Sequence, residues 1–210
     1  CCVGLRGQCV SELKDECDTF SYAGMARIGR WIRLLNKWGA SDAVMVGGVG
    51  KTVMHDPFSI LRLMPDLTSL QLWYRRLRHD RRDATVLSAI AEELQKSGVT
   101  LIDSTTHIPD HLAGDGVLGQ VAPSAKQSAD IDFGWPLLTQ SAALHIGQSI
   151  AVRDGDVLAV EAIEGTAALI ERAGTLCKKS GWTLLKTAAD DHDMRADVPS
   201  IGVQTIEQVS

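Results

Sequence analysis

Short apolar runs alternate with amphipathic segments through the first half of the chain, and this alternation limits the fold more than any other feature. Residues 1–5, 42–46 and 99–103 are apolar and strand-like. Residues 26–38 and 83–98 instead carry apolar side chains at helical spacing. Strand and helix in alternation predict a parallel α/β sheet of Rossmann-like type in this half.

Two glycines and a lysine follow one of the predicted strands. Gly47 and Gly48 end the run at 42–46, and Lys51 comes shortly after them. Ligands of parallel α/β sheets bind at the carboxyl ends of strands, where these residues lie. Residues 47–52 match only the end of a nucleotide-binding P-loop, because Met45 occupies the position of its first glycine. The stretch therefore predicts a looser phosphate cradle of backbone amides with one lysine charge.

A change of pattern marks the middle of the chain. An Asp-Pro start predicts one more helix over residues 56–64, still in the first half. Residues 104–122 contain proline and glycine without periodicity, which is typical of a loop. We expect an N-terminal Rossmann-like domain over 1–110, a linker over 111–122 and a C-terminal mixed α/β domain over 123–210.

The second half contains the clearest local signal. Asp154-Gly155 separates two apolar runs within residues 148–163, which predicts a β-hairpin. Residues 166–181 have the pattern of a helix, and residues 182–188 that of a further strand. These elements predict a small domain of mixed α/β type.

A helix is also predicted over residues 123–145. Gly134 and Pro136 interrupt its pattern, so we expect the helix to bend or split there. Asp130 and Asp132 are two positions apart and do not share a helical face, which argues against a paired-carboxylate site.

Composition excludes some classes of function. The chain has 210 residues and a net charge of −5, so it has no overall attraction to nucleic acid. It contains no apolar run of membrane-spanning length. Its five cysteines are an odd number without a C-x-x-C pair, which favours reduced thiols in a cytoplasmic protein. The chain starts at Cys1 and not at methionine, which is typical of a fragment, and we expect truncation at both ends.

Two charged stretches have competing interpretations. Residues 73–83 hold five arginines and a histidine, which indicates either a solvated helix face or a landing site for anionic lipid or phosphate. Glu161 and Glu164 follow a predicted strand, with Gly165 and Thr166 directly after them. Thr166 could cap the next helix, and the amides used in capping also bind anions.

An acidic loop follows the last predicted strand. Asp197 lies in it, just past the strand that carries Lys186, and Pro199 stiffens the chain beside it. Carboxylates at such a place suit Mg²⁺, which binds a few carboxylates together with substrate phosphate oxygens. The spacing alone leaves open whether the loop is functional or only solvated.

Taken in order, several motifs resemble one family. The second half contains ADIDFGW, IGQSIAV, VLAVEAIEGT and MRADVPSIG, and the first half contains GRWIRLLNKWGASDAVMVGG and GVTLIDST. This ordered set resembles the LpxI-type UDP-2,3-diacylglucosamine pyrophosphatases over nearly the whole chain. The resemblance implies two α/β domains and Mg²⁺-dependent hydrolysis of that lipid to UMP and 2,3-diacylglucosamine 1-phosphate, a step of lipid A synthesis.

The resemblance also implies a set of site residues. Arg195, Asp197, Pro199 and Gly202 match a family motif R-x-D-x-P-x-x-G, in which the aspartate is essential, so Asp197 is the expected catalytic residue. Asp197 and Glu161 are the expected metal ligands. The expected substrate-binding residues are Gly47, Gly48, Lys51, Gln148, Glu164, Gly165, Thr166, Lys186 and Arg195.

Two other classes of function stay open at this point. A Rossmann-like nucleotide-sugar or dinucleotide-binding oxidoreductase would need a G-x-G-x-x-G fingerprint, which these residues lack. A non-catalytic lipid-binding module would use the arginine-rich stretch. For the pyrophosphatase we expect a cytoplasmic protein peripheral to the inner membrane, whose partner is the lipid substrate and not nucleic acid. Homo-oligomerisation is left open.

Overall fold

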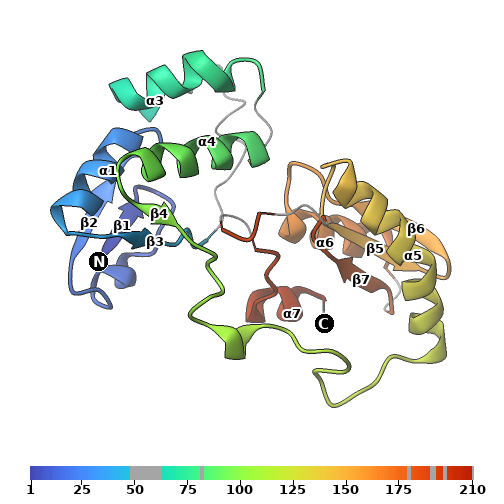
Figure 1. Ribbon diagram of the computed structural model, residues 1–210. Helices are drawn as coiled ribbons and strands as arrows, with labels where there is room; N and C mark the ends of the chain where they lie inside the picture. Colours follow the sequence, from blue (N-terminus) through green and yellow to red (C-terminus); the bar gives the residue numbers. More distant parts are fainter. Residues whose placement is uncertain (48–62, 81–82, 179–180, 190–192, 196–197, 210) are drawn as a thin grey trace. The chain divides into compact units, whose positions relative to one another are not determined.

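The chain divides into two compact units (Figure 1). The computed structural model describes residues 1–47, 63–80, 83–178, 181–189, 193–195 and 198–209. The N-terminal unit comprises Cys1–Ile108 with Asp193–Asp197, and the C-terminal unit comprises Pro109–His192 with Val198–Ser210. The helix predicted over residues 56–64 lies outside the described residues, apart from its last two positions.

Short strands alternate with helices in the N-terminal unit. Its elements are β1 (Cys2–Leu5), the 3₁₀ turn η1 (Ser11–Lys14), β2 (Phe20–Ala23), α1 (Ile28–Lys37), β3 (Asp42–Ala43), α3 (Leu67–Leu72), the π turn η3 (Trp73–Leu77), α4 (Asp83–Lys96) and β4 (Thr100–Leu101). The predicted helices at 26–38 and 83–98 are confirmed as α1 and α4. The sequence patterns predict no element at β2, a strand of only four residues. All five cysteines are free thiols.

The strands of this unit pair in parallel, as predicted. Cys2 lies opposite Phe20 in the β1–β2 pair, and Asp42 lies opposite Thr100 in the β3–β4 pair. Within the described ranges these are two separate pairs and not one continuous sheet. The buried strand predicted over 42–46 is wrong beyond its first two residues, because β4 pairs only with Asp42–Ala43 and Val46 is 84% exposed.

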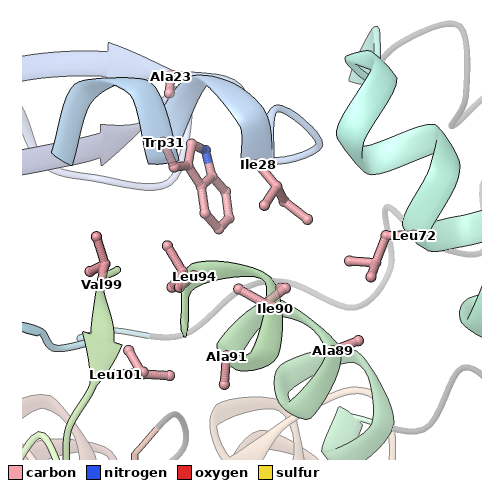
Figure 2. Packing of buried hydrophobic residues seen from close by; sticks show 10 residues of the cluster. All are labelled: Ala23, Ile28, Trp31, Leu72, Ala89, Ile90, Ala91, Leu94, Val99 and Leu101. Carbon is pink, nitrogen blue, oxygen red and sulfur yellow. The ribbon is translucent and has the colours of Figure 1, made fainter. Parts of the chain in front are cut away.

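An apolar cluster forms the core of the N-terminal unit (Figure 2). Trp31 of α1, Leu72 of α3, Ile90 of α4 and Leu101 of β4 are all buried in it. The indole N–H of Trp31 donates to the carbonyl of Gly24 at 3.0 Å, so the ring is buried without an unsatisfied donor. Elements that are distant in sequence are therefore held together mainly by apolar contact.

Asp66 joins α3 to α1. Its carboxylate accepts hydrogen bonds from the N–H and the hydroxyl of Ser69 and from the N–H of Arg30, each at 3.0 Å. Burial acts to raise the pKa of Asp66, but the bonds from Ser69 and Arg30 outweigh it and the pKa is lowered overall. A Cβ at Gly29 would lie 2.6 Å from the hydroxyl oxygen of Thr68, so α1 approaches this segment too closely for a larger residue.

The C-terminal unit is a three-stranded antiparallel sheet with helices. Its elements are the 3₁₀ turn η4 (Pro109–His111), α5 (Ala125–Ala143), β5 (Ser149–Arg153), β6 (Asp156–Val160), α6 (Thr166–Leu176), β7 (Thr183–Lys186) and α7 (Val203–Val209). The strand order is β6–β5–β7, with β5 antiparallel to both neighbours. This arrangement confirms the predicted mixed α/β type. In the part of the chain that the structure describes, none of the helices is both long and apolar enough to cross a bilayer.

The predicted hairpin is formed by β5 and β6. Asp154 and Gly155 at its tip have φ angles of 53° and 73°, a left-handed pair that D-G sequences favour in tight hairpin turns. Asp130 of α5 is 2% exposed, and its Oδ1 accepts the Gly155 N–H at 2.9 Å. Asp132 is exposed, so the two aspartates face different ways, as their spacing predicts. Asp130 therefore fastens the helix to the hairpin tip.

Of the two outcomes expected for the helix before β5, a bend or a split, the split is wrong. α5 runs unbroken from Ala125 to Ala143 with Pro136 inside it. A Cβ at Gly134 would lie 2.6 Å from Leu185 Cδ1 and 2.8 Å from Val152 Cγ2. The glycine thus marks close packing of the helix on the sheet, and this tertiary contact outweighs the local tendency to break.

Helices α5 and α6 cover opposite faces of the sheet. The α5 side contains Leu138, Ile150, Val152 and Leu185, and the α6 side contains Ala151, Ala159, Leu169, Ile170 and Ala173. Successive residues of β5 enter these two cores in turn, as strand alternation requires. Both faces of β5 are consequently buried, which holds the start of this strand in a fixed position.

Candidate functional site

The C-terminal unit gathers polar side chains at one edge of its sheet. Ile150 lies opposite Val160 on one side of β5, and Ser149 lies opposite Lys186 on the other. Because β5 is antiparallel to both neighbours, its start meets the ends of β6 and β7. The N–H of Glu161, just past β6, donates to the Ser149 carbonyl at 2.8 Å. The register thus brings together residues that are far apart in sequence.

Four of these side chains form one hydrogen-bonded group, named here the Thr166 cluster: Ser149, Glu161, Thr166 and Lys186. Lys186 Nζ donates to Thr166 Oγ1 at 3.1 Å, and this hydroxyl donates to Glu161 Oε2 at 3.1 Å. Ser149 Oγ lies 3.4 Å from the same hydroxyl. A hydroxyl has one proton and two acceptor lone pairs, so Thr166 can serve all three partners at once.

The cluster combines an ammonium group with a buried carboxylate. Glu161 is 7% exposed and Ser149 is fully buried. A buried carboxylate is costly unless it is hydrogen-bonded, and the Thr166 hydroxyl supplies that bond to Glu161 while it accepts from the Lys186 ammonium. The sheet edge therefore holds a positive charge in a fixed position.

Lys186 also contacts the segment that follows the predicted catalytic aspartate along the chain. Its Nζ donates to the carbonyl of Ser200 at 2.9 Å. An ammonium group has three protons, and the bonds to Thr166 and Ser200 use two of them. Among the described residues the third proton has no acceptor, so it is available to an anionic ligand.

Gly165 and Thr166 form the start of α6. Gly165 is the N-cap, with φ 85° and ψ 168°, a conformation almost confined to glycine. The prediction that Thr166 caps the helix is wrong, because Thr166 is the first helical residue and its hydroxyl turns to Glu161 and Lys186. Gly165 supplies no capping side chain, so the first amides of α6 point out beside the cluster. Such amides favour an anion.

Close backbone contact fixes the loop before β5. A Cβ at Gly147 would lie 2.0 Å from the carbonyl oxygen of Glu161, so only glycine fits there. Gln148 follows, and its buried Oε1 has no hydrogen-bond partner among the described residues. Strand alternation turns Gln148 away from the side that Ser149 faces, so this predicted binding residue is next to the Thr166 cluster in sequence but not part of it.

Glu164 is held by a separate contact. Its Oε1 pairs with Arg172 NH2 of α6 at 2.9 Å, and the same nitrogen donates to the Val160 carbonyl at 2.5 Å. Glu164 therefore closes the loop between β6 and α6, and the structure does not bring it into the Thr166 cluster.

The predicted phosphate cradle belongs to the other unit. Gly47 has a φ of 92°, which favours glycine, and it follows the two-residue strand β3. Gly48 and Lys51 lie outside the described residues. Asp103 follows β4, and its Oδ1 accepts from the N–H and the hydroxyl of Thr105 at 2.8 and 2.7 Å. These bonds, the hydroxyl's first, lower the pKa of Asp103 and keep it as a carboxylate that terminates the strand.

The motif that carries the predicted catalytic residue is described only in part. Arg195 binds Asp193 through two side-chain bonds of 2.8 and 2.7 Å, and these bonds raise the pKa of Arg195 further above its ordinary value. The Met194 carbonyl accepts from the Ser104 N–H at 3.4 Å, which places this turn beside the loop after β4. Asp197 lies outside the described residues.

Two members of the sheet edge are missing from the sequence prediction. Ser149 and Gly147 both lie in the IGQSIAV motif, but of that motif only Gln148 was expected to bind substrate. Ser149 could have been noticed as a polar residue that opens an otherwise apolar strand. The burial of Ser149 depends on the register of the strands, which sequence patterns do not define. The same is true of the contact that excludes a side chain at Gly147.

A complete metal-ligand set is not present in the described part of the chain. No three or more His, Cys, Asp or Glu side chains come together there in a way that could hold an ion. Of the two predicted metal ligands, Glu161 is the one described. Its Oε2 is bonded to Thr166, so any metal role falls to its other carboxylate oxygen.

Comparison with known proteins identifies relatives over both units. The model of the LpxI N-terminal domain matches residues 1–111, and that of the LpxI C-terminal domain matches residues 114–210. The chain is 29% identical over 195 residues to the UDP-2,3-diacylglucosamine pyrophosphatase LpxI of Caulobacter vibrioides. The aligned part covers 89% of this chain and 68% of that relative. The Thr166 cluster lies entirely within the C-terminal match.

Proposed function

The chain belongs to the LpxI family, and on that basis we propose that it hydrolyses the pyrophosphate of UDP-2,3-diacylglucosamine. The activity is that of its Caulobacter relative. Cleavage of this phosphoanhydride yields UMP and 2,3-diacylglucosamine 1-phosphate, a step in the synthesis of lipid A. The observation that supports it best is the Thr166 cluster, which presents a lysine proton beside uncapped helix amides.

The chemistry asks for charge compensation more than for covalent catalysis. A diphosphate carries negative oxygens, and charge builds on the leaving phosphate as the bond to it breaks. The free proton of Lys186 and the first amides of α6 are suited to those oxygens. Thr166 and Glu161 hold the ammonium group in position before substrate binds, so little reorganisation is needed during the reaction.

Asp197 is the proposed catalytic residue. Its support is the motif formed with Arg195, Pro199 and Gly202. A carboxylate there would orient the attacking water and accept its proton. Arg195 and Gln148 are proposed substrate contacts, since the first is a fixed cation and the second has a buried oxygen without a donor. Glu164 and Gly47, with the undescribed Gly48 and Lys51, stay in the proposal as weaker candidates.

We propose Mg²⁺ as the cofactor. Mg²⁺ in phosphate-processing sites is held by one or two carboxylates together with substrate oxygens, so a full protein cage is not required. Glu161 fits this pattern, because one of its oxygens is fixed by Thr166 while the other has no bond among the described residues. Asp197 would be the second ligand. When bound, the ion would neutralise charge on the diphosphate oxygens.

The lipid substrate also bears on location. A diacylated sugar nucleotide has its acyl chains in a bilayer and its nucleotide in water. The partner of this chain is therefore a membrane-held substrate, and we propose that the protein works at the cytoplasmic surface of the inner membrane. Whether it does so as a homo-oligomer is a separate question that this proposal does not need.

The test is release of UMP from UDP-2,3-diacylglucosamine dispersed in detergent, measured by chromatography with Mg²⁺ and with excess chelator. We expect Mg²⁺-dependent turnover, and a loss of at least about a thousand-fold in Asp197→Asn. Asp115→Asn, a change at an exposed aspartate in the loop before α5, is the matched control and should keep full activity. UMP release unaffected by Asp197→Asn would refute the assignment of the catalytic residue. Absence of UMP release from the unmodified protein would refute the proposed function.

A further inference from the structure

Helix α3 and the π turn that follows it are apolar on the side that faces solvent. Leu67 is 70% exposed, Leu70 44%, Trp73 39% and Tyr74 62%. Leu67 and Leu70 are three residues apart and share one face of α3, and Trp73 and Tyr74 follow in the π turn. This outer face, defined as these four residues, is a patch of large apolar side chains on a short helix.

The opposite side of the same helix is already occupied. Leu72 is 8% exposed and points from α3 into the core of the N-terminal unit, as Figure 2 shows. Ser69, on the same side, is 7% exposed. A helix that packs against a core needs only one apolar stripe, and its solvent side is normally polar. The packing of the described residues therefore does not account for the outer face.

The π turn explains how so many large residues come to be exposed in succession. Arg78 N–H donates to the Trp73 carbonyl at 2.9 Å, a bond five residues long that widens the turn. Leu72 and Leu77, five residues apart, can then both pack into the core. The four residues between them, from Trp73 to Arg76, are all exposed.

Basic side chains border the outer face. Residues 67–79 contain Arg75, Arg76, Arg78 and His79 and no Asp or Glu. Arg76 pairs with Glu92 of α4 at 2.7 Å, so its charge is compensated. The guanidinium of Arg78 lies 4.4 Å from the centre of the Tyr74 ring and keeps its charge. Arg75 and Arg78 thus leave a local positive charge on a chain whose net charge is −5.

We propose that the outer face, together with Arg75 and Arg78, docks the protein on an anionic lipid bilayer. Exposed Leu, Trp and Tyr beside arginines are the composition of helices that lie in a membrane interface, where aromatic rings sit at headgroup level and arginines reach lipid phosphates. A second copy of the same face is a poorer partner, because two sets of uncompensated arginines would repel. The proposal rests on the proposed function only for its choice of a membrane as the partner.

The experiment is sedimentation of the full chain with vesicles that contain no sugar nucleotide. One set is phosphatidylcholine, and the other contains about 30 mol% phosphatidylglycerol, close to an ordinary anionic surface. We expect binding to the anionic vesicles only, and we expect added salt to weaken it. Trp73 should show a blue-shifted emission on binding, which Trp73→Phe removes.

Two kinds of variant separate charge from apolar contact. Each arginine near an anionic surface is expected to change affinity about five-fold, so Arg75→Glu with Arg78→Glu should weaken binding at least about thirty-fold. The double variant Leu70→Ser with Tyr74→Ser removes apolar surface without changing the charge, and it should also weaken binding to the anionic vesicles. Arg33→Glu, at an exposed arginine of α1, is the matched control and should lose far less. These residues are exposed, so melting temperatures should stay close to that of the unmodified protein.

The outcomes distinguish this proposal from the proposed function. UMP release from detergent-dispersed substrate should be unchanged in the docking variants, since none of them touches the proposed site. Equal binding to both vesicle types, or loss in Arg33→Glu as large as in the paired arginine variant, would overturn the proposal. So would failure to bind vesicles combined with a concentration-dependent dimer that Leu70→Ser with Tyr74→Ser abolishes.

Discussion

The two units use burial in different ways. In the N-terminal unit the described residues form a core of apolar side chains, with Trp31 at its centre and Ser69 as the buried polar group. In the C-terminal unit, Asp130, Ser149 and Glu161 are all buried. Buried polar groups cost stability and are retained where they give specificity or function. The contrast indicates that the N-terminal unit is stabilised by apolar packing, whereas the C-terminal unit gives up some stability to hold polar groups in place.

The contrast predicts its largest effect on stability at Trp31. Trp31→Ala removes the aromatic ring from the N-terminal core and leaves the Gly24 carbonyl without its donor, which should cost about 3–5 kcal/mol in the free energy of unfolding. Hydrogen exchange should show lost protection in peptides of α1, α4 and β4. Peptides of β5 and β7 should change much less. Trp38→Ala, at a less buried tryptophan of the same segment, is the control. Equal loss of protection in both units would show that the two cores are not separate.

A change at Lys186 should instead affect turnover much more than stability. Lys186→Met keeps an unbranched apolar stem but removes the ammonium, so UMP release should fall about a hundred-fold or more, as when a preorganised donor is lost from an active site. Melting temperature should fall little by comparison. Lys126→Met removes an exposed ion pair between α5 and Asp154 of the hairpin tip, and it should leave turnover unchanged. If Lys186→Met destabilised the C-terminal unit and lowered turnover only in proportion to the unfolded fraction, the Thr166 cluster would have only a structural role.

The same contrast shows which parts of the molecule sequence patterns predict. The hairpin at Asp154-Gly155 follows from local turn chemistry, and helix α4 ends at Lys96, just before Gly98 with its φ of 87°. Features that depend on distant contacts are harder. The expected interruption of α5 does not split the helix, because Gly134 packs closely on the sheet in a tertiary contact. β3 is shorter than its apolar run, since strand length depends on a partner that periodicity does not specify.

For the site, the order of the motifs predicts more of the residues than the chemistry of single residues does. Glu161, Thr166 and Lys186 were expected near substrate, and the antiparallel register brings them together. Ser149 escapes prediction because a serine at the start of a strand has no distinctive spacing. Thr166 was expected to be the N-cap of the helix, but the N-cap is Gly165. The Thr166 hydroxyl is therefore available for the bonds of the cluster. A one-residue difference in where a helix begins thus changes the function assigned to a side chain.

In the N-terminal unit, the main polar contact is expected to have a moderate and pH-dependent effect. Asp66→Ala removes the N-cap of α3 and its bond to α1, which should cost about 2 kcal/mol. The pKa of Asp66 is lowered in the folded protein, so its contribution is complete above the unfolded value of about 4 and is lost as pH falls through the folded value. Unfolding measured from neutral to acid pH should therefore show the two proteins converging at low pH. A difference that stayed constant across this range would exclude the ionised carboxylate as the cause.

The smallest expected effect separates the two roles of the Thr166 cluster most sharply. Thr166→Val removes the hydroxyl at similar volume, which leaves buried Glu161 without its donor and Lys186 without one acceptor. Stability should fall by about 1 kcal/mol. If the hydroxyl positions the ammonium, kcat should fall about ten-fold with little change in KM, because the lost interaction acts on the transition state.

Thr166→Ser tests this reading directly, since it restores the hydroxyl without the methyl group and should recover most of kcat. Thr175→Val, which removes an exposed hydroxyl bond to the Glu171 carbonyl within α6, serves as the control for the same chemical change in the same helix. If the Thr166 hydroxyl were purely structural, Thr166→Val would be less stable but would have the same kcat as Thr175→Val. If the serine variant recovers kcat, the Thr166 hydroxyl positions Lys186 for catalysis. If kcat does not recover, the buried polar groups of the C-terminal unit contribute only to stability, as the apolar core of the N-terminal unit does.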